Sequence, residues 1–147
     1  MTANVSEEHF RKLERMYASA PINRYYDPVL HVAEGVTKLT MPVKPEFFHA
    51  ANAIHGAVYF KALDDSAFFA ASSLVMDVFV LTVSFNLSIV RPVSSGELRA
   101  SGMVVHRSRN LIIADSVVHD SEGRQVARGS GTFMPSKIAL SADIGYA

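Results

Sequence analysis

The sequence predicts an α+β fold in which one long central helix is wrapped by a curved antiparallel sheet. Residues 56–74 form an apolar stretch with the length and composition of a buried helix. Residues 81–89 alternate between apolar and polar, and three further strand-like segments follow, separated by turn-like sequences. Consecutive strands joined by short turns are typical of an antiparallel sheet. The chain therefore predicts one helix packed on a meander of strands.

The first part of the chain predicts one short helix followed by one or two strands. Ser6, with acidic residues directly after it, has the features of a helix start, and apolar residues recur at helical spacing from there to Pro21. Residues 29–43 alternate well enough to form a strand or a hairpin, which is interrupted near Glu34 and Gly35. The long helix follows.

The stretch over residues 81–89 shows the clearest strand pattern. Its odd-numbered positions are all apolar, namely Leu81, Val83, Phe85, Leu87 and Ile89, whereas the even-numbered positions are small and polar. This alternation predicts a strand whose odd-numbered side chains face the core. Further strands are expected over residues 97–107, 111–119 and 125–134.

Length and composition restrict the class of protein. A chain of 147 residues predicts a single domain over residues 1–147, with an N-terminal helix within residues 1–20 and a C-terminal tail over residues 136–147. The 14 basic residues balance the 14 acidic ones, so no overall attraction for nucleic acid or an anionic membrane is expected. The absence of cysteine excludes disulfides, thiolate metal sites and a cysteine nucleophile.

Neither a signal peptide nor a membrane span is expected. The N-terminal segment is charged, and no apolar run approaches the roughly 18 residues of a transmembrane helix. We therefore expect a soluble, cytoplasmic protein. The six histidines show no spacing that places metal ligands on one predicted face, so no metal site is expected.

The long helix carries two adjacent carboxylates, Asp64 and Asp65. Lys61 precedes Asp65 by one helical turn, and an ion pair between them accounts for that aspartate. Asp64 lies on a different ridge of the helix, which it shares with Phe60 and Phe68. Burying a carboxylate on such a ridge costs several kcal/mol unless something compensates, so Asp64 is the candidate for a functional role.

The residues at the start of this helix resemble those of a known family. His55 and Gly56 stand there, Asp64 follows after eight intervening positions, and Arg91 ends the first strand of the second half. Over roughly residues 21–134 the chain resembles the hotdog-fold thioesterases of the phenylacetate-degradation (PaaI-like) type. That family has the motif His-Gly-Gly with the catalytic aspartate nine residues after the histidine. The resemblance implies a single hotdog domain and assigns the catalytic role to Asp64.

The sequence departs from the family pattern at two positions. Ala57 replaces the usual second glycine, which narrows the approach of a thioester to the backbone. A polar residue, often Asn, commonly stands about six positions before the histidine of the family. Here that position holds His49, whereas Asn52 stands only three positions before His55. The polar role before the histidine therefore falls to either His49 or Asn52.

The resemblance implies hydrolysis of an acyl-coenzyme A thioester to a free acid and coenzyme A. Unpaired N–H groups at a helix start can polarise the thioester carbonyl and stabilise the oxyanion, and Gly56 leaves that approach open. With Asn52, His55 and Asp64, it forms the expected catalytic set, in which the aspartate acts as nucleophile or general base. Coenzyme A is part of the substrate, so no separate cofactor is expected.

The spacing of Gly56 and Asp64 has a consequence for assembly. Eight residues along one helix separate them by about 12 Å, so they cannot act on the same carbonyl within one chain. A second helix running antiparallel beside the first, as in a two-fold dimer, would bring them together. We therefore expect a homodimer with two shared sites, or a dimer of dimers.

For the nucleotide end of coenzyme A, the resemblance points to two polar segments. Thr82 and Arg91 lie on or next to the strand that follows the helix. The turn after residue 106 supplies the other candidates, Arg107, Ser108, Arg109 and Asn110. Its two arginines can pair with phosphates.

Two other functions are alternatives. One is a hotdog hydratase or dehydratase acting on an acyl thioester, and the other is a non-catalytic acyl-CoA-binding protein. The His-Gly and aspartate spacing favours hydrolysis over both. The aromatic residues of the helix are compatible with an aryl and with an aliphatic acyl group.

Overall fold

The structure is a computed structural model that describes residues 2–147, with side chains from Ser6 onward. Met1, where the predicted domain range starts, lies outside the described residues. The helices are α1 (Thr2–Ser19), α2 (Asn23–Tyr26) and α3 (Gly56–Ser72), and short 3-10 turns cover Pro45–Phe47 and Ala142–Ile144. The strands are β1 (Val29–Ala33), β2 (Val36–Pro42), β3 (Val78–Ile89), β4 (Glu97–Arg107), β5 (Ile112–His119) and β6 (Gln125–Ala139).

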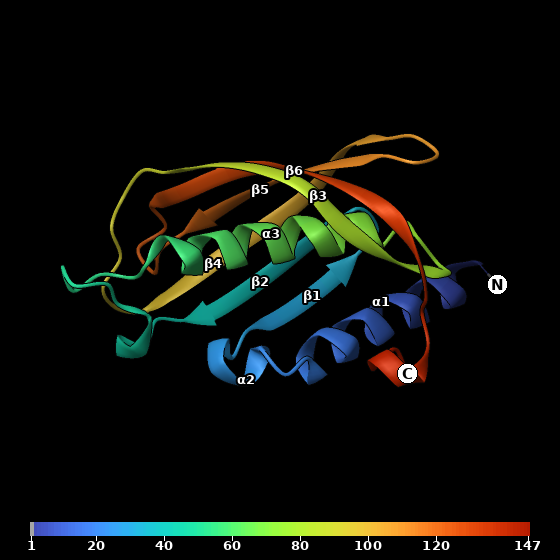
Figure 1. The fold of residues 1–147 in the computed structure, drawn as a ribbon, viewed down its shortest axis with the longest axis horizontal. Helices are drawn as coiled ribbons and strands as arrows, with labels where there is room; N and C mark the ends of the chain where they lie inside the picture. Colours follow the sequence, from blue (N-terminus) through green and yellow to red (C-terminus); the bar gives the residue numbers. More distant parts are fainter. Residues whose placement is uncertain (1) are drawn as a thin grey trace.

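The six strands form one antiparallel sheet in the order β1-β2-β4-β5-β6-β3. Figure 1 shows the sheet curving around α3, and this helix contacts every strand. α1 lies outside the space that the curved sheet encloses, and it packs beside β1. The predicted α+β architecture, a long central helix wrapped by a curved antiparallel sheet, is therefore confirmed.

Small residues allow α3 to lie close to the sheet. Ala62, Ala67 and Ala70 are fully buried on the helix. Opposite them on β4, Gly102 faces Ser66, and a Cβ at Gly102 would overlap the Ser66 carbonyl oxygen. The position therefore requires glycine because of the close backbone approach. This tight contact holds the middle of α3, where Asp64 and Asp65 lie, at a defined height above the sheet.

Two predicted boundaries differ from the structure. α1 begins at Thr2 and ends at Ser19, whereas the sequence pattern placed the helix between Ser6 and Pro21. β6 continues to Ala139, five residues beyond the predicted end of that strand, because its last residues pair with the start of β3. Part of the segment expected as a C-terminal tail, residues 136–147, is therefore strand.

The odd-numbered residues of β3 do not all face the core, so the prediction from their alternation was wrong for the first half of the strand. The pairing with β6 shifts at Val83, which forms a β-bulge. Before the bulge Thr82 faces α3, and after it Phe85 packs against the core. Leu81 and Val83 are exposed instead, by 47% and 56%. One extra residue thus reverses which face the later side chains occupy.

The two edges of the sheet differ. At the β1 edge, Glu14 of α1 accepts a hydrogen bond from the Val32 N–H at 2.8 Å, and Arg11 donates to the Val32 carbonyl at 2.6 Å. The β3 edge is 12 residues long, and no strand of the described chain pairs with its outer side. Its apolar side chains Leu81 and Val83 are exposed. The sheet therefore has one occupied edge and one open edge.

Candidate active site

The start of α3 is shaped by the side chain that caps it. The Nδ1 atom of His55 accepts a hydrogen bond from the Ala57 N–H at 2.9 Å, which makes His55 the N-cap of the helix. Gly56 is the first helical residue, and the described residues offer its N–H no acceptor. An unpaired donor at the positive end of a helix dipole can bind a carbonyl oxygen that becomes negative.

The loop before α3 holds the two polar candidates His49 and Asn52. Asn52 has a φ of 64°, in the left-handed region that Asn tolerates, and its N–H donates to the His49 carbonyl at 3.0 Å. The Asn52 carbonyl accepts from the Ser94 hydroxyl at 3.0 Å, and the imidazole of His49 accepts from the Ala51 N–H at 3.0 Å. Both side chains are exposed, and neither forms a hydrogen bond with His55 in the described chain.

Arg91 lies close to the start of α3. Its carbonyl accepts a hydrogen bond from the Tyr59 hydroxyl at 2.8 Å, which ties the end of β3 to the first turns of the helix. Arg91 and Gly56 line the same cavity of about 310 Å³, together with His49 and Ile89. The structure therefore brings one predicted phosphate-binding residue next to the predicted oxyanion donor.

Asp64 faces β3 from the middle of α3. Its Oδ1 accepts a hydrogen bond from the Thr82 hydroxyl at 2.9 Å. Burial raises the pKa of Asp64 to about 6, against the opposing effect of the Thr82 hydrogen bond, which favours the charged form. A carboxylate that titrates near neutral pH can take up a proton during a reaction, as a general base does.

Asp65 has a different set of partners. Its Oδ2 lies 2.6 Å from the Lys61 Nζ, so the ion pair expected from their spacing is present. The same oxygen accepts a hydrogen bond of 2.5 Å from the Tyr17 hydroxyl of α1. Burial and the neighbouring Asp65 raise the pKa of Tyr17, which stays protonated and donating. Asp65 thus joins α1 to α3 through Tyr17. The helical spacing of the sequence did not predict this contact of Tyr17.

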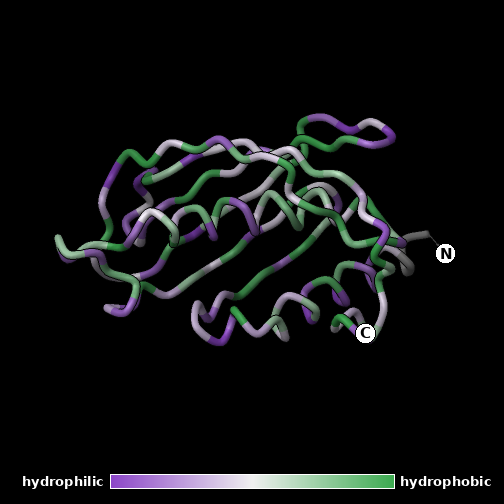
Figure 2. Tube along the Cα trace, viewed as in Figure 1, coloured by the Kyte–Doolittle hydropathy of each residue, from purple (hydrophilic) through white to green (hydrophobic). Residues whose placement is uncertain are grey.

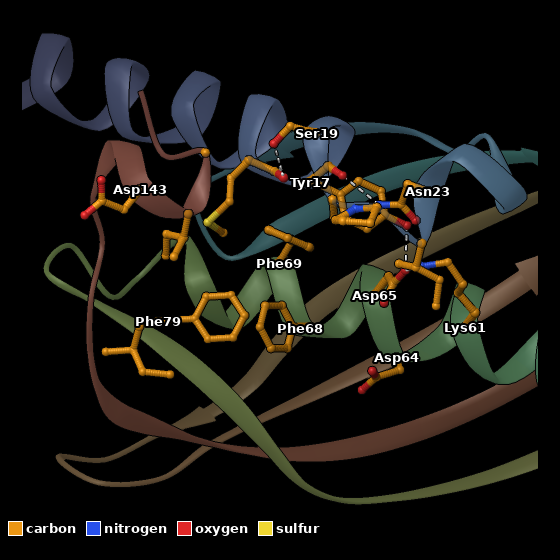
Figure 3. Close-up of a pocket in the computed structure, with 17 residues that line it drawn as sticks. Tyr17, Ser19, Asn23, Lys61, Asp64, Asp65, Phe68, Phe69, Phe79 and Asp143 are labelled. Atoms are coloured by element: carbon orange, nitrogen blue, oxygen red, sulfur yellow. Dashed lines mark hydrogen bonds and ion pairs between the residues drawn. The ribbon is translucent and has the colours of Figure 1, made fainter.

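An apolar cavity of about 610 Å³ opens beside Asp64. Its lining comes from the end of α1, the middle of α3, the start of β3 and the segment after β6. Figure 3 shows Asp64 on the wall of this cavity, with Phe68 and Phe79 further along it. The rings of these two phenylalanines lie 5.3 Å apart. The candidate carboxylate therefore borders a space large enough for a small-molecule ligand.

The predicted nucleotide-binding turn lies at the other end of α3. Arg107, Ser108, Arg109 and Asn110 line a cavity of about 520 Å³ between β4, β5 and the loop after α3. The Arg107 guanidinium donates to the Leu74 carbonyl at 3.0 Å. In Figure 2 the tip of this turn is hydrophilic. Its side chains are exposed and can reach an anionic ligand.

Within one chain the site residues form three separate groups along α3. The first surrounds Gly56 at the helix start, the second is Asp64 with Thr82, and the third is the turn at Arg107 beyond the helix end. The first two groups are about 12 Å apart along the helix axis, at 1.5 Å per residue. A single chain therefore does not assemble them at one point.

Thr82, which the resemblance places along the coenzyme A path, has its hydroxyl on the Asp64 carboxylate. No group of three or more potential metal ligands occurs among residues 2–147. Over the same part of the chain, none of the helices has the length and apolar character needed to cross a bilayer.

Comparison with known proteins gives a consistent result. The model of the thioesterase superfamily matches residues 51–127, just over half of the chain. The structure of the PaaI protein from the phenylacetic acid degradation operon of E. coli superposes with a TM-score of 0.84 at 17% identity, covering 93% of this chain and 99% of that one. A thioesterase family protein from Silicibacter pomeroyi superposes with a TM-score of 0.78 at 24% identity, covering 84% and 95%.

A sequence relative supports the same class. The Thermoplasma acidophilum protein named "Putative esterase Ta0293" is 20% identical over 105 residues, which cover 71% of this chain and 80% of the relative. The match to the thioesterase superfamily and the hotdog fold thus support thioester hydrolysis in general. The chain belongs to the thioesterase superfamily, and its resemblance to the PaaI type is confirmed.

Proposed function

We propose that this protein hydrolyses acyl-CoA thioesters to a free acid and coenzyme A, at two equivalent sites shared across a two-fold dimer. The observation that carries the proposal is the pairing of groups on α3. Gly56 presents an N–H at the helix start that no acceptor of the described chain occupies, and eight residues later Asp64 holds a carboxyl group whose pKa is raised to about 6 by burial. These are the donor and the base that acyl transfer from a thioester needs.

A two-fold axis beside α3 would complete the site. If the axis passes near Phe60, midway between Gly56 and Asp64, the partner's helix runs antiparallel and places its aspartate level with Gly56. Phe60 is 39% exposed on a helix that is otherwise largely buried, which leaves an apolar side chain for such a contact. The open β3 edge offers backbone groups for the same association.

The same axis also accounts for the third group of residues. Because antiparallel helices exchange their ends, the partner's turn at Arg107, which contacts Leu74 beyond the end of α3, would lie about 15 Å past Gly56 along the helix axis. The partner's Arg107 and Arg109 would then lie farther from the thioester carbon than Arg91, which lines the cavity at Gly56. Three guanidinium groups suit the phosphates of coenzyme A, which enters as part of the substrate.

The reaction follows from this arrangement. The Gly56 N–H binds the thioester carbonyl oxygen, and the partner's Asp64 either removes a proton from water that attacks the carbonyl carbon or attacks that carbon itself. The carbon–sulfur bond breaks, and the coenzyme A thiolate leaves and takes up a proton. In the second route, water then hydrolyses the acyl-enzyme anhydride. Both routes consume one water and need no metal or further cofactor.

The proposal is tested by the release of free thiol from a panel of acyl-CoA thioesters. We expect thiol release by the wild-type protein and a fall in kcat of about 100-fold or more in Asp64→Asn, with little change in KM. The matched variant Asp65→Asn should retain most of its kcat. Free thiol distinguishes hydrolysis from hydration of the acyl chain and from binding alone. Absence of thiol release across the panel, or equal losses in the two variants, would contradict the proposal.

A further inference from the structure

The cavity beside Asp64 is built by a single chain and is closed by contacts far apart in sequence. His9 on α1 donates from Nε2 to the Ser72 carbonyl at 2.9 Å, and its Nδ1 lies 2.7 Å from the Tyr146 hydroxyl. Burial lowers the pKa of His9, which keeps the imidazole neutral so that Nδ1 accepts from the tyrosine. These bonds hold α1 and the segment after β6 over α3. The cavity wall is therefore already formed without a ligand.

The lining of the cavity is apolar along most of its length. Phe68, Phe69 and Phe79 cover one side, and Met16, Ile138 and Ile144 belong to the elements that close it. Figure 3 shows Phe68 and Phe79 extending away from Asp64, so the apolar surface continues from the carboxylate. A group attached to the reacting carbonyl would enter this surface directly.

The positive charge at the cavity is already paired. Of the described lining residues, Lys61 is the one cation, and its Nζ lies 2.6 Å from Asp65. The same Nζ also lies about 5 Å from the ring centres of Tyr17 and Tyr26, in positions typical of cation–π contacts. Among these lining residues no free cation therefore remains to bind a second carboxylate at the end of an acyl group. The cavity suits a neutral, apolar ligand.

The volume favours a chain over a single ring. At roughly 30 Å³ for a group the size of a water molecule, the 610 Å³ cavity has room for about 20 methylene-sized groups. A phenylacetyl group would leave more than half of this space empty. At the same value of roughly 30 Å³ for each carbon, an extended chain would fill about half of the cavity with 10 carbons and about two thirds with 14, and the remainder lies at the open mouth.

We propose that this cavity binds the acyl group of the substrate and that the preferred acyl group is an unbranched, uncharged aliphatic chain of about 10 to 14 carbons. The inference rests on the proposed acyl-CoA hydrolysis and adds the substrate class. It also gives α1 and the segment after β6 a role in substrate specificity, because both line the cavity although neither would contact the reacting atoms. Ala20, directly after the end of α1, lines the cavity, so a larger side chain at this position would reduce the cavity volume.

The test compares kcat/KM across butanoyl-, octanoyl-, dodecanoyl-, phenylacetyl- and benzoyl-CoA. With the wild-type protein, kcat/KM should rise about threefold to fourfold for each added methylene until the chain fills the cavity. Ala20→Phe should reduce kcat/KM for dodecanoyl-CoA by about tenfold or more relative to butanoyl-CoA. Ala18→Phe is the matched control because Ala18 is exposed on α1 and does not line the cavity. Thermal melting checks that both variants are folded.

A binding measurement separates this inference from the proposed function. Decanoic acid should bind the Asp64→Asn protein in calorimetry, and Ala20→Phe in the same background should weaken that binding by about tenfold. If the wild-type protein hydrolyses no acyl-CoA but the Asp64→Asn protein binds decanoate, the proposed function is overturned and the pocket assignment is kept. The pocket assignment would be overturned if hydrolysis were fastest with an aryl substrate. It would also be overturned if Ala20→Phe and the wild type showed the same chain-length dependence. Either result would keep the proposed function.

Discussion

Asp64 and Asp65 are adjacent in sequence but meet different partners because they project from different sides of α3. Asp65 is held by Lys61 and Tyr17, and its side chain is 17% exposed. Asp64 accepts a hydrogen bond from Thr82, and burial raises its pKa to about 6. Asp65 is therefore occupied in joining α1 to α3, whereas Asp64 remains available for proton transfer.

The Thr82 hydroxyl should set the pH at which the enzyme becomes active. Thr82 donates to the charged carboxylate and so lowers a pKa that burial has raised. Thr82→Val removes the donor, so the pKa of Asp64 should rise further and the acid limb of kcat/KM should move up by about half to one pH unit. Activity should fall at pH 6 and change little above pH 8.

The measurement is a pH profile of kcat/KM for the wild type, Thr82→Val and Thr82→Ser. The serine variant keeps a hydroxyl group and should retain the wild-type acid limb. An acid limb that stays in place in Thr82→Val would show that a group other than Asp64 controls it.

The sequence predicted elements better than it predicted their contacts. The alternation over residues 81–89 located β3, yet the bulge at Val83 depends on pairing with β6, which local alternation does not encode. Thr82 was consequently assigned to the wrong face. The partly buried position of Asp64 could be predicted as unusual because a carboxylate on an apolar ridge of a helix is costly to bury. Tyr17 was not found, because its contact with Asp65 spans 48 residues.

At the level of elements, the packing of α3 on β4 should depend on Gly102. Because a Cβ there would overlap the Ser66 carbonyl oxygen, Gly102→Ala should force α3 away from the sheet and lower the free energy of unfolding by about 2–3 kcal/mol. Gly123→Ala is a useful comparison, since Gly123 has a φ of +79° but no heavy atom within 4 Å of the place that an added methyl group would take. It should cost about 1 kcal/mol, through backbone strain alone.

Urea unfolding of the two variants measures this difference. The Gly102 variant should unfold at a clearly lower urea concentration than the Gly123 variant. Similar unfolding midpoints would mean that the helix and the sheet can separate without loss of stability.

At the scale of the whole molecule, the shared site predicts complementation between two inactive proteins. Gly56→Val blocks the approach to the helix start, and Asp64→Asn removes the base or nucleophile. Refolding the two together in equal amounts should give about half hybrid dimers, each with one intact site and one doubly damaged site. About a quarter of wild-type activity should return, if the sites act independently.

The mixture is assayed for thiol release after hybrid formation has been verified with two different affinity tags. Each variant refolded alone is the control and should remain inactive. Hybrids that form but stay as inactive as their parents would place Gly56 and Asp64 of one working site in the same chain.

The unequal edges of the sheet also limit how far association can proceed. When two β3 edges pair, the strands left at the ends of the joined sheet are both β1, where Arg11 and Glu14 already occupy the backbone groups of Val32. An incoming strand would have to displace these helix side chains before it could add. Extension of the sheet by pairing of strand edges would therefore end at two copies, and α1 would keep a protein with a long, apolar open edge from forming a filament through its sheet.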